Sequence, residues 1–102
     1  MKVVWSKNAQ YSYGEELEFI DKKWTSREVE NFMTLVENFI KNLETGIIKG
    51  KMSPKTNMRS FVISKQTTLF FTFHENTETI ELLLFWNNLR SPKALKKKLK
   101  GY

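Results

Sequence analysis

Residues 58–86 read MRSFVISKQTTLFFTFHENTETIELLLFW, and this stretch decides the fold because it holds three short runs of β-branched and aromatic side chains. The runs are Met58–Ser64, Thr68–His74 and Thr79–Trp86. Only three or four mostly polar residues separate one run from the next, which is short enough for hairpins. We therefore predict three antiparallel strands joined as a meander. The last run is almost continuously apolar, as expected for a central strand covered on both faces.

Two amphipathic helices are predicted before these strands. In the first, apolar residues recur at helical intervals from Asn8, and acidic residues fall on the other, solvated side. The apolar set is Ala9, Tyr13, Leu17, Ile20 and Trp24, and the acidic set is Glu15, Glu16, Glu18 and Asp21. The second helix has the stronger pattern, a single apolar stripe that ends before Gly46. This stripe consists of Val29, Phe32, Met33, Val36, Phe39, Ile40 and Leu43.

The two ends of the chain add one strand and one helix. At the N-terminal end, Lys2–Ser6 begins as a short apolar strand. Between the two helices, Thr25–Glu28 has the pattern of a capping box, which marks the start of the second helix. Near the other end, Ser91 and Pro92 start a basic helix as its N-cap and first-turn residue. The order is therefore β-α-α-β-β-β plus a short C-terminal basic helix. We predict one α+β domain over residues 1–102, with an antiparallel sheet backed by a two-helix hairpin.

Composition limits the classes of function. At 102 residues and 40% apolar content, the chain can bury one hydrophobic core. The absence of cysteine excludes disulfides, thiolate zinc sites and a cysteine nucleophile. The apolar start at Val3–Trp5 is too short for the core of a signal peptide, and no apolar run approaches the length needed to span a membrane. We expect a cytoplasmic protein with no membrane partner.

The net charge of +6 is unevenly distributed along the chain. Residues 1–89 carry eleven basic and eleven acidic side chains, so the whole excess lies beyond them. Residues 15–44 hold eight acids against four bases, whereas residues 45–74 hold five bases and no acid. A field divided in this way attracts acidic segments or polyanions toward its basic side. We expect the far face of the sheet and the lysine-rich end to form one continuous cationic cleft.

No complete catalytic constellation emerges from the sequence. The single histidine, His74, lies at a strand end beside a hairpin loop, where a partly exposed structural histidine is the simpler interpretation. Glu75, Glu78 and Glu81 lie close together, but no second histidine or cysteine joins them, so we expect no metal and no cofactor. Arg59, His74 and Arg90 remain as the weak catalytic candidates.

Four segments in the same order resemble toxins of the RelE/ParE superfamily from bacterial type II toxin–antitoxin modules. Val4–Ala9 is similar to that family's first strand and the "S-x-x-A" start of its first helix, and Trp24–Ser26 resembles the join of its helical hairpin. Met58–Ser64 followed by Leu69–Phe71 resembles its "hydrophobic-Arg-x-hydrophobic … L-x-Tyr" hairpin. Phe85–Lys93 resembles its closing strand and "D-x-R-x-x-P-x-x-L" segment. The resemblance implies a RelE/ParE-like fold.

The chain departs from the family pattern at several functional positions. Asn87, Leu89 and Phe71 stand where the family has Asp, Arg and Tyr. An arginine of the branch that cuts mRNA on the ribosome falls on Thr68, and the C-terminal tyrosine of that branch falls among lysines. Arg59 is the one basic strand position that matches both branches. The resemblance therefore favours the ParE-like branch, which is not a nuclease.

The resemblance implies a toxin of the ParE-like, plasmid-stabilisation kind, neutralised by an acidic antitoxin and acting on a cellular target, for which the family implies DNA gyrase. The implied antitoxin or target contacts are Lys51, Lys55, Arg59, Trp86, Arg90, Lys93, Lys96 and Lys97. A first alternative is a RelE-like, ribosome-dependent mRNA endoribonuclease. A second is a decayed, non-toxic basic binding module. A homo-oligomer, or a hetero-oligomer with the antitoxin, is compatible with each. The sheet face that carries Arg59 stays open, because Phe61 and Ile63 share its side of the strand by alternation.

Overall fold

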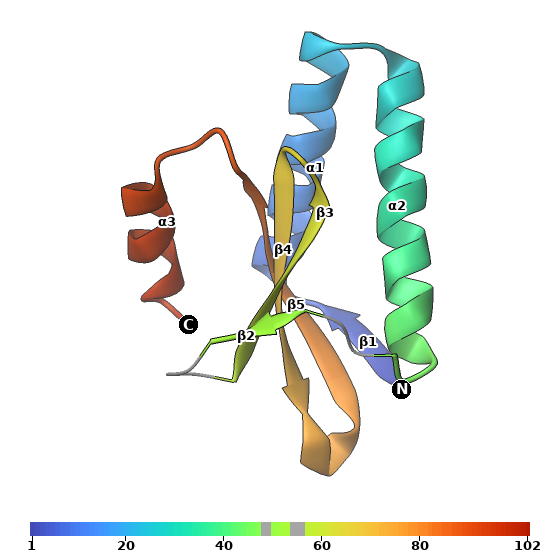
Figure 1. Cartoon of the computed structure of the whole chain (residues 1–102), viewed down its shortest axis with the longest axis vertical. Coiled ribbons are helices and arrows are strands. Elements are labelled where there is room, and N and C mark those ends of the chain that lie inside the picture. The colour runs from blue at the N-terminus through green and yellow to red at the C-terminus, as the bar shows by residue number, and fades with distance from the viewer. Residues whose placement is uncertain (48–49, 54–56) are drawn as a thin grey trace.

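The computed structural model describes residues 1–47, 50–53 and 57–102. Its helices and strands are β1 (Lys2–Trp5), α1 (Lys7–Lys23), α2 (Ser26–Glu44), β2 (Lys51–Met52), β3 (Met58–Ser64), β4 (Thr67–His74), the 3₁₀ turn η1 (Glu75–Thr77), β5 (Thr79–Asn87) and α3 (Pro92–Leu99). The strands form one sheet in the order β1-β5-β4-β3-β2 (Figure 1). The predicted α+β architecture is confirmed, including the two-helix hairpin and the C-terminal helix.

The sheet differs from the prediction at its two edges. β1 pairs in parallel with β5, with Val3 opposite Ile80, so the sheet is mixed rather than wholly antiparallel. This pairing places β5 between β1 and β4. Its sequence is apolar on both faces because the α1–α2 pair covers one face and α3 covers the other. At the other edge lies β2, a strand that was not predicted, and it pairs with Arg59 and Ser60 of β3. Gly50 precedes β2 at a φ of +122°, and a Cβ there would lie 2.9 Å from the Ser60 carbonyl oxygen, so only glycine fits without strain.

One face of the sheet is covered by the α1–α2 pair, which Figure 1 shows running side by side. Phe71, Leu69, Ile80 and Leu82 are completely buried there. Phe39 of α2 stacks on Phe61 with ring centroids 4.2 Å apart and meets Phe71 edge-on at 5.8 Å. This face holds the main hydrophobic core of the protein.

The other face is covered by α3, a helix of only eight residues. Its Ala94, Leu95 and Leu99 pack on a second buried cluster that contains Met58, Phe70, Leu83, Leu84 and Trp86. A bulge in β5 makes this cluster possible, because Phe70 pairs with Leu84 while Phe71 pairs with Leu82. The extra residue, Leu83, turns a second leucine toward α3. Its carbonyl oxygen accepts hydrogen bonds from the Ser6 and Tyr102 hydroxyls instead of a ladder partner.

The start of α1 and the end of α2 are stabilised by the capping residues next to them, whereas the start of α2 differs from the prediction. The Ser6 hydroxyl caps α1 by accepting from the Ala9 N–H, and Gly46, at a φ of +90°, lies just beyond the end of α2 as predicted. The predicted capping box at α2 is wrong: Thr25 occupies the N-cap, but its side chain makes no capping hydrogen bond. The Glu28 N–H is satisfied by the Thr25 carbonyl oxygen instead.

Candidate functional site

The predicted cationic cleft is not continuous, because α3 divides it. A groove of about 320 Å³ lies between α3 and β2–β3, and a separate pocket of about 350 Å³ lies between α3 and α1. Arg59 and Lys51 line the former, which we term the α3–β3 groove, whereas Arg90 and Lys98 line the latter. The prediction failed because Leu95 and Leu99 pack α3 flat onto the sheet instead of leaving the face beneath it open.

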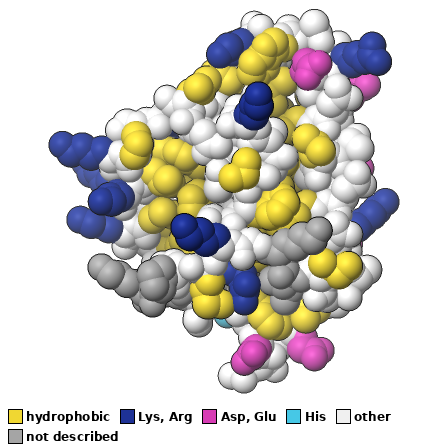
Figure 2. Space-filling model, viewed as in Figure 1, with side chains coloured by type: hydrophobic (Ala, Val, Ile, Leu, Met, Phe, Trp, Pro, Cys, Tyr) yellow, Lys and Arg dark blue, Asp and Glu magenta, His cyan; other side chains and the backbone are white. Residues whose placement is uncertain are grey.

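The α3–β3 groove has an apolar floor with cations beside it. Met58, Phe70 and Leu99 supply the floor, and the exposed side chain of Lys51 lies next to it. Figure 2 shows hydrophobic side chains between the basic cluster over α3, on the left, and further basic side chains toward the centre of the view. An acidic segment with apolar side chains would match both features of this surface.

The strand pairing settles which face carries Arg59. Arg59 lies opposite Phe71, whose ring is buried in the α1–α2 core, so both side chains leave the sheet on that side. The Arg59 Nε atom is buried and has no hydrogen-bond partner among the described residues. Since a buried guanidinium N–H without a partner is costly, this N–H is poised to donate a hydrogen bond to an oxygen of a partner.

His74 and Arg59 also meet in a third hollow, the His74 pocket, of about 590 Å³. The His74 Nε2 atom lies 3.5 Å from Glu81 Oε1, and its side chain is half-exposed, which agrees with the loop-edge interpretation. Arg90 does not line this pocket. The structure therefore brings together two of the three catalytic candidates and leaves the third, Arg90, in the separate pocket between α3 and α1.

The sequence analysis missed Glu16, which it placed on the solvated face of the first helix. Glu16 is only 5% exposed, and its carboxylate accepts a hydrogen bond from Thr67 Oγ1 at the start of β4. The signal was present in the spacing: Glu16 follows Tyr13 by three residues and precedes Ile20 by four, which puts it on the apolar stripe. A charged residue at a stripe position indicates a specific partner more than a solvated face.

The surroundings of Glu16 act on its pKa in opposite directions. Burial is the largest effect and raises the pKa of this carboxyl, and nearby Glu15 raises it further. Hydrogen bonds from Thr67 and Asn87 and the positive charge of Arg90 lower the pKa, but they do not fully offset the burial. Asn87 is itself buried and fixed, since its Oδ1 accepts from the Leu89 N–H at 2.9 Å.

Trp86, one of the predicted antitoxin or target contacts, is buried and offers almost no surface to a partner. Its side chain is 2% exposed, because α3 covers one part of it and the Arg90 guanidinium lies 4.2 Å from the ring centroid. The prediction failed because the apolar run of β5 is covered on both faces, and Trp86 faces α3. Its role in the structure is to hold Arg90 in place by a cation–π contact.

Four lysines remain among the predicted antitoxin or target contacts. Lys93, Lys96 and Lys97 are exposed on α3, and Lys55 lies outside the described residues. Within the described ranges, no three or more His, Asp or Glu side chains gather as a metal site would require. No helix in the described part of the chain is both long and apolar enough to cross a membrane.

Comparisons with known proteins identify the fold. No family profile matches the chain, and no curated protein matches its sequence. Several solved structures are similar to it, among them the following three. A chain of the chromosomal ParDE TA system from P. aeruginosa shares 12% identity at a TM-score of 0.69 and covers 85% of this chain and 95% of its own. The YoeB/ParE toxin from Agrobacterium tumefaciens shares 16% identity at 0.55 and covers 86% and 99%. The isolated E. coli RelE toxin shares 13% identity at 0.57 and covers 99% and 98%.

These likenesses extend over nearly the full length of both chains in each pair. At such low identity they show the fold and not the activity. The protein therefore has the fold of RelE/ParE superfamily toxins, as the sequence resemblance implied.

Proposed function

We propose that this protein is the toxin of a toxin–antitoxin pair, of the ParE-like kind, and that an acidic antitoxin segment silences it by binding along the α3–β3 groove. The observation that carries the proposal is the groove itself, in which an apolar floor of Met58, Phe70 and Leu99 lies beside the exposed side chain of Lys51. The fold shared with ParE and RelE toxins supports the toxin assignment.

The edge of β3 offers a second element of recognition. β2 pairs only with Arg59 and Ser60, so residues 61–64 have no strand partner on that side among the described residues. Val62 on this edge is 61% exposed. An extended antitoxin segment can add to such an edge through main-chain hydrogen bonds while its acidic side chains reach the cations. The exposed lysines of α3 would speed the encounter by long-range attraction.

The growth of cells that express the chain alone tests the toxin assignment. We expect growth arrest, and rescue when the short acidic reading frame expected next to the gene is expressed with it. Harmless expression of folded protein would instead favour a decayed binding module. For the cellular target we propose DNA gyrase, in which case arrest comes with DNA damage signalling and intact mRNA.

One observation favours a second candidate function, a ribosome-dependent endoribonuclease. Arg59 and His74 share the His74 pocket, and an arginine beside an ionisable imidazole suits a phosphodiester undergoing proton transfer. Mapping of mRNA 5′ ends after induction separates the two functions. Cuts inside translated codons, abolished by His74→Ala, would establish the nuclease and overturn the ParE-like assignment.

The antitoxin interface is tested by charge reversal. Lys51→Glu should weaken antitoxin binding severalfold at low salt and less at 0.5 M salt, because exposed charge pairs are screened. Lys22→Glu is the matched control, since Lys22 is an exposed lysine near the end of α1 and does not line the groove. Equal effects of the two reversals would show that the antitoxin binds elsewhere.

A further inference from the structure

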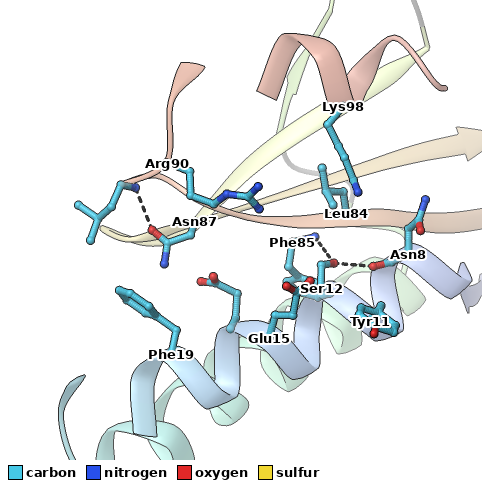
Figure 3. A pocket seen from close by; sticks show the side chains of 12 residues that line it. Asn8, Tyr11, Ser12, Glu15, Phe19, Leu84, Phe85, Asn87, Arg90 and Lys98 are labelled. Atoms are coloured by element: carbon cyan, nitrogen blue, oxygen red, sulfur yellow. Dashed lines mark hydrogen bonds between the residues drawn. The ribbon is translucent and has the colours of Figure 1, made fainter. Parts of the chain in front are cut away.

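The pocket between α1, the β5–α3 turn and α3 plays no part in the function proposed above. We term it the Glu16 pocket. Figure 3 shows Arg90 and Lys98 on one side of it and Tyr11, Glu15 and Phe19 of α1 on the other. Its volume of about 350 Å³ lies in the range of small-molecule sites, and its lining combines apolar and aromatic side chains with polar and charged ones.

The polar group at the base of this pocket is an acceptor. An ionised carboxylate offers two oxygens with about four hydrogen-bonding positions and no donor. Thr67 and Asn87 supply two donors to Glu16, so capacity remains for two more. Because Glu16 is buried and lines the pocket, a ligand with two adjacent N–H donors would satisfy it.

The polar groups at the mouth of the pocket are cations. The Arg90 guanidinium lies over the Trp86 ring, 4.2 Å from its centroid, and this cation–π contact leaves its N–H groups for another partner. No carboxylate within ion-pair distance of Arg90 or Lys98 is found in the described part of the chain. A planar arginine fork with a lysine beside it suits a phosphate.

The walls of the pocket suit a flat ring. Tyr11 is 76% exposed and Leu89 is 66% exposed, although side chains of this size are usually better buried in a small domain. Phe19 is half-buried on the same side of α1 as Tyr11. Aromatic side chains in this position provide stacking surface for a nucleobase.

We propose that the Glu16 pocket binds a guanosine 5′-phosphate, with the guanine edge on the Glu16 carboxylate, the ring between the α1 aromatics and Leu89, and the phosphate at Arg90 and Lys98. Guanine is the only common base with two adjacent donors, N1–H and N2–H, on its pairing edge. Adenine and cytosine place an acceptor nitrogen there, and uracil has a single N–H between two carbonyls. A guanidinium ligand would satisfy Glu16 but is repelled by Arg90 and Lys98.

Calorimetric titration of the full chain with GMP, AMP and inorganic phosphate tests the proposal. We expect GMP to bind about tenfold or more tightly than AMP, since a good bidentate contact gives discrimination of that order. Phosphate alone should bind more weakly than either. Equal affinities for GMP and AMP, or no binding of GMP at millimolar concentration, would overturn the proposal.

Three variants locate the site. Glu16→Gln should reduce the preference for GMP over AMP to less than about threefold, because the amide presents a donor where the carboxylate accepts. Glu15→Gln is the matched control, since Glu15 is a neighbour that lines the same pocket but is exposed, and it should leave the preference unchanged. Arg90→Ala should weaken GMP and AMP by the same factor. A folded Glu16→Gln protein that discriminates as well as wild type, or an Arg90→Ala protein with unchanged affinity, would place the nucleotide elsewhere.

Discussion

The two faces of the sheet differ in how completely helices cover them. The face under α1 and α2 is closed by two long helices and contains completely buried aromatic and aliphatic side chains. The face under α3 is covered by eight residues, which leave a hollow on each side of that helix. The difference indicates that the first face supplies most of the folding free energy, while the second presents the surfaces for recognition.

The largest effect is expected on the α1–α2 face. Phe71→Ala removes a fully buried ring that contacts Phe39, and it should lower the free energy of unfolding by about 3–5 kcal/mol. Leu99→Ala on the half-buried edge of α3 should cost about 1 kcal/mol, because less apolar surface is lost there. Urea denaturation measures both values. A Leu99 cost equal to that of Phe71 would contradict the division between the faces.

A smaller effect is expected at Glu16, which ties α1 to the ends of β4 and β5. Glu16→Ala leaves the donors of Thr67 and Asn87 without their acceptor and should cost about 1–3 kcal/mol. Glu16→Gln retains an acceptor oxygen and should cost less. Chemical denaturation of the three proteins at one pH compares them, and equal stabilities would show that the donors find other acceptors.

Wild type and Glu16→Gln also allow a test of how stability depends on pH. Because the folded-state pKa of Glu16 is raised, the folded protein binds the proton more tightly than the unfolded chain does. Wild type should therefore lose stability relative to Glu16→Gln as the pH rises from the ordinary glutamate pKa through the raised one. Above that window the difference should be constant. A difference that grows with falling pH in favour of Glu16→Gln would mean that the hydrogen bonds and Arg90 outweigh burial.

Asn87 stands where the toxins that the sequence resembles have Asp. The substitution Asn87→Asp tests whether the buried Glu16 disfavours an aspartate at this position. The substitution replaces the amide donor of Asn87 with a second carboxylate beside the buried carboxylate of Glu16. We expect the free energy of unfolding to fall by about 1–2 kcal/mol near neutral pH. The loss should shrink as the pH falls, because one shared proton removes the repulsion. Thermal unfolding across pH measures it. In the Glu16→Gln background the Asp substitution should cost clearly less, and an equal cost in both backgrounds would exclude this coupling.

The smallest effect on stability is expected at Tyr102, whose hydroxyl group holds the end of α3 against β5 and α1 by hydrogen bonds. The Tyr102 hydroxyl donates to the Leu83 carbonyl oxygen at 3.2 Å and accepts from Asn8 Nδ2 at 2.9 Å. Tyr102→Phe should cost about 0.5–1.5 kcal/mol and speed hydrogen exchange in α3. The comparison variant is Tyr11→Phe, at a largely exposed position. Exchange rates in α3 that do not change would show that its apolar edge alone holds it.

Most of the fold could be predicted from the sequence, whereas the candidate sites could be predicted only in part. The alternation in residues 58–86 and the stripe of α2 specify strands and a helix because side-chain direction repeats with a fixed period in each. The parallel pairing of β1 could not be predicted, since it joins residues more than seventy positions apart. Arg59 and Lys51 were found as charges in a basic segment, but that signal did not show that α3 would separate them from Arg90.

By itself, the sequence determined the order of the elements apart from β2, the helical hairpin, the buried central strand and the concentration of lysine at one end. Each of these depends on neighbours within a few residues. Only the tertiary structure decided that Trp86 is covered, that Arg59 faces the α1–α2 side and that Glu16 lies buried beside Thr67 and Asn87. These features depend on contacts between segments far apart in the chain. The same carboxylate would be an ordinary solvated group on an isolated helix, and it becomes a buried acceptor only when β4 and β5 close over it.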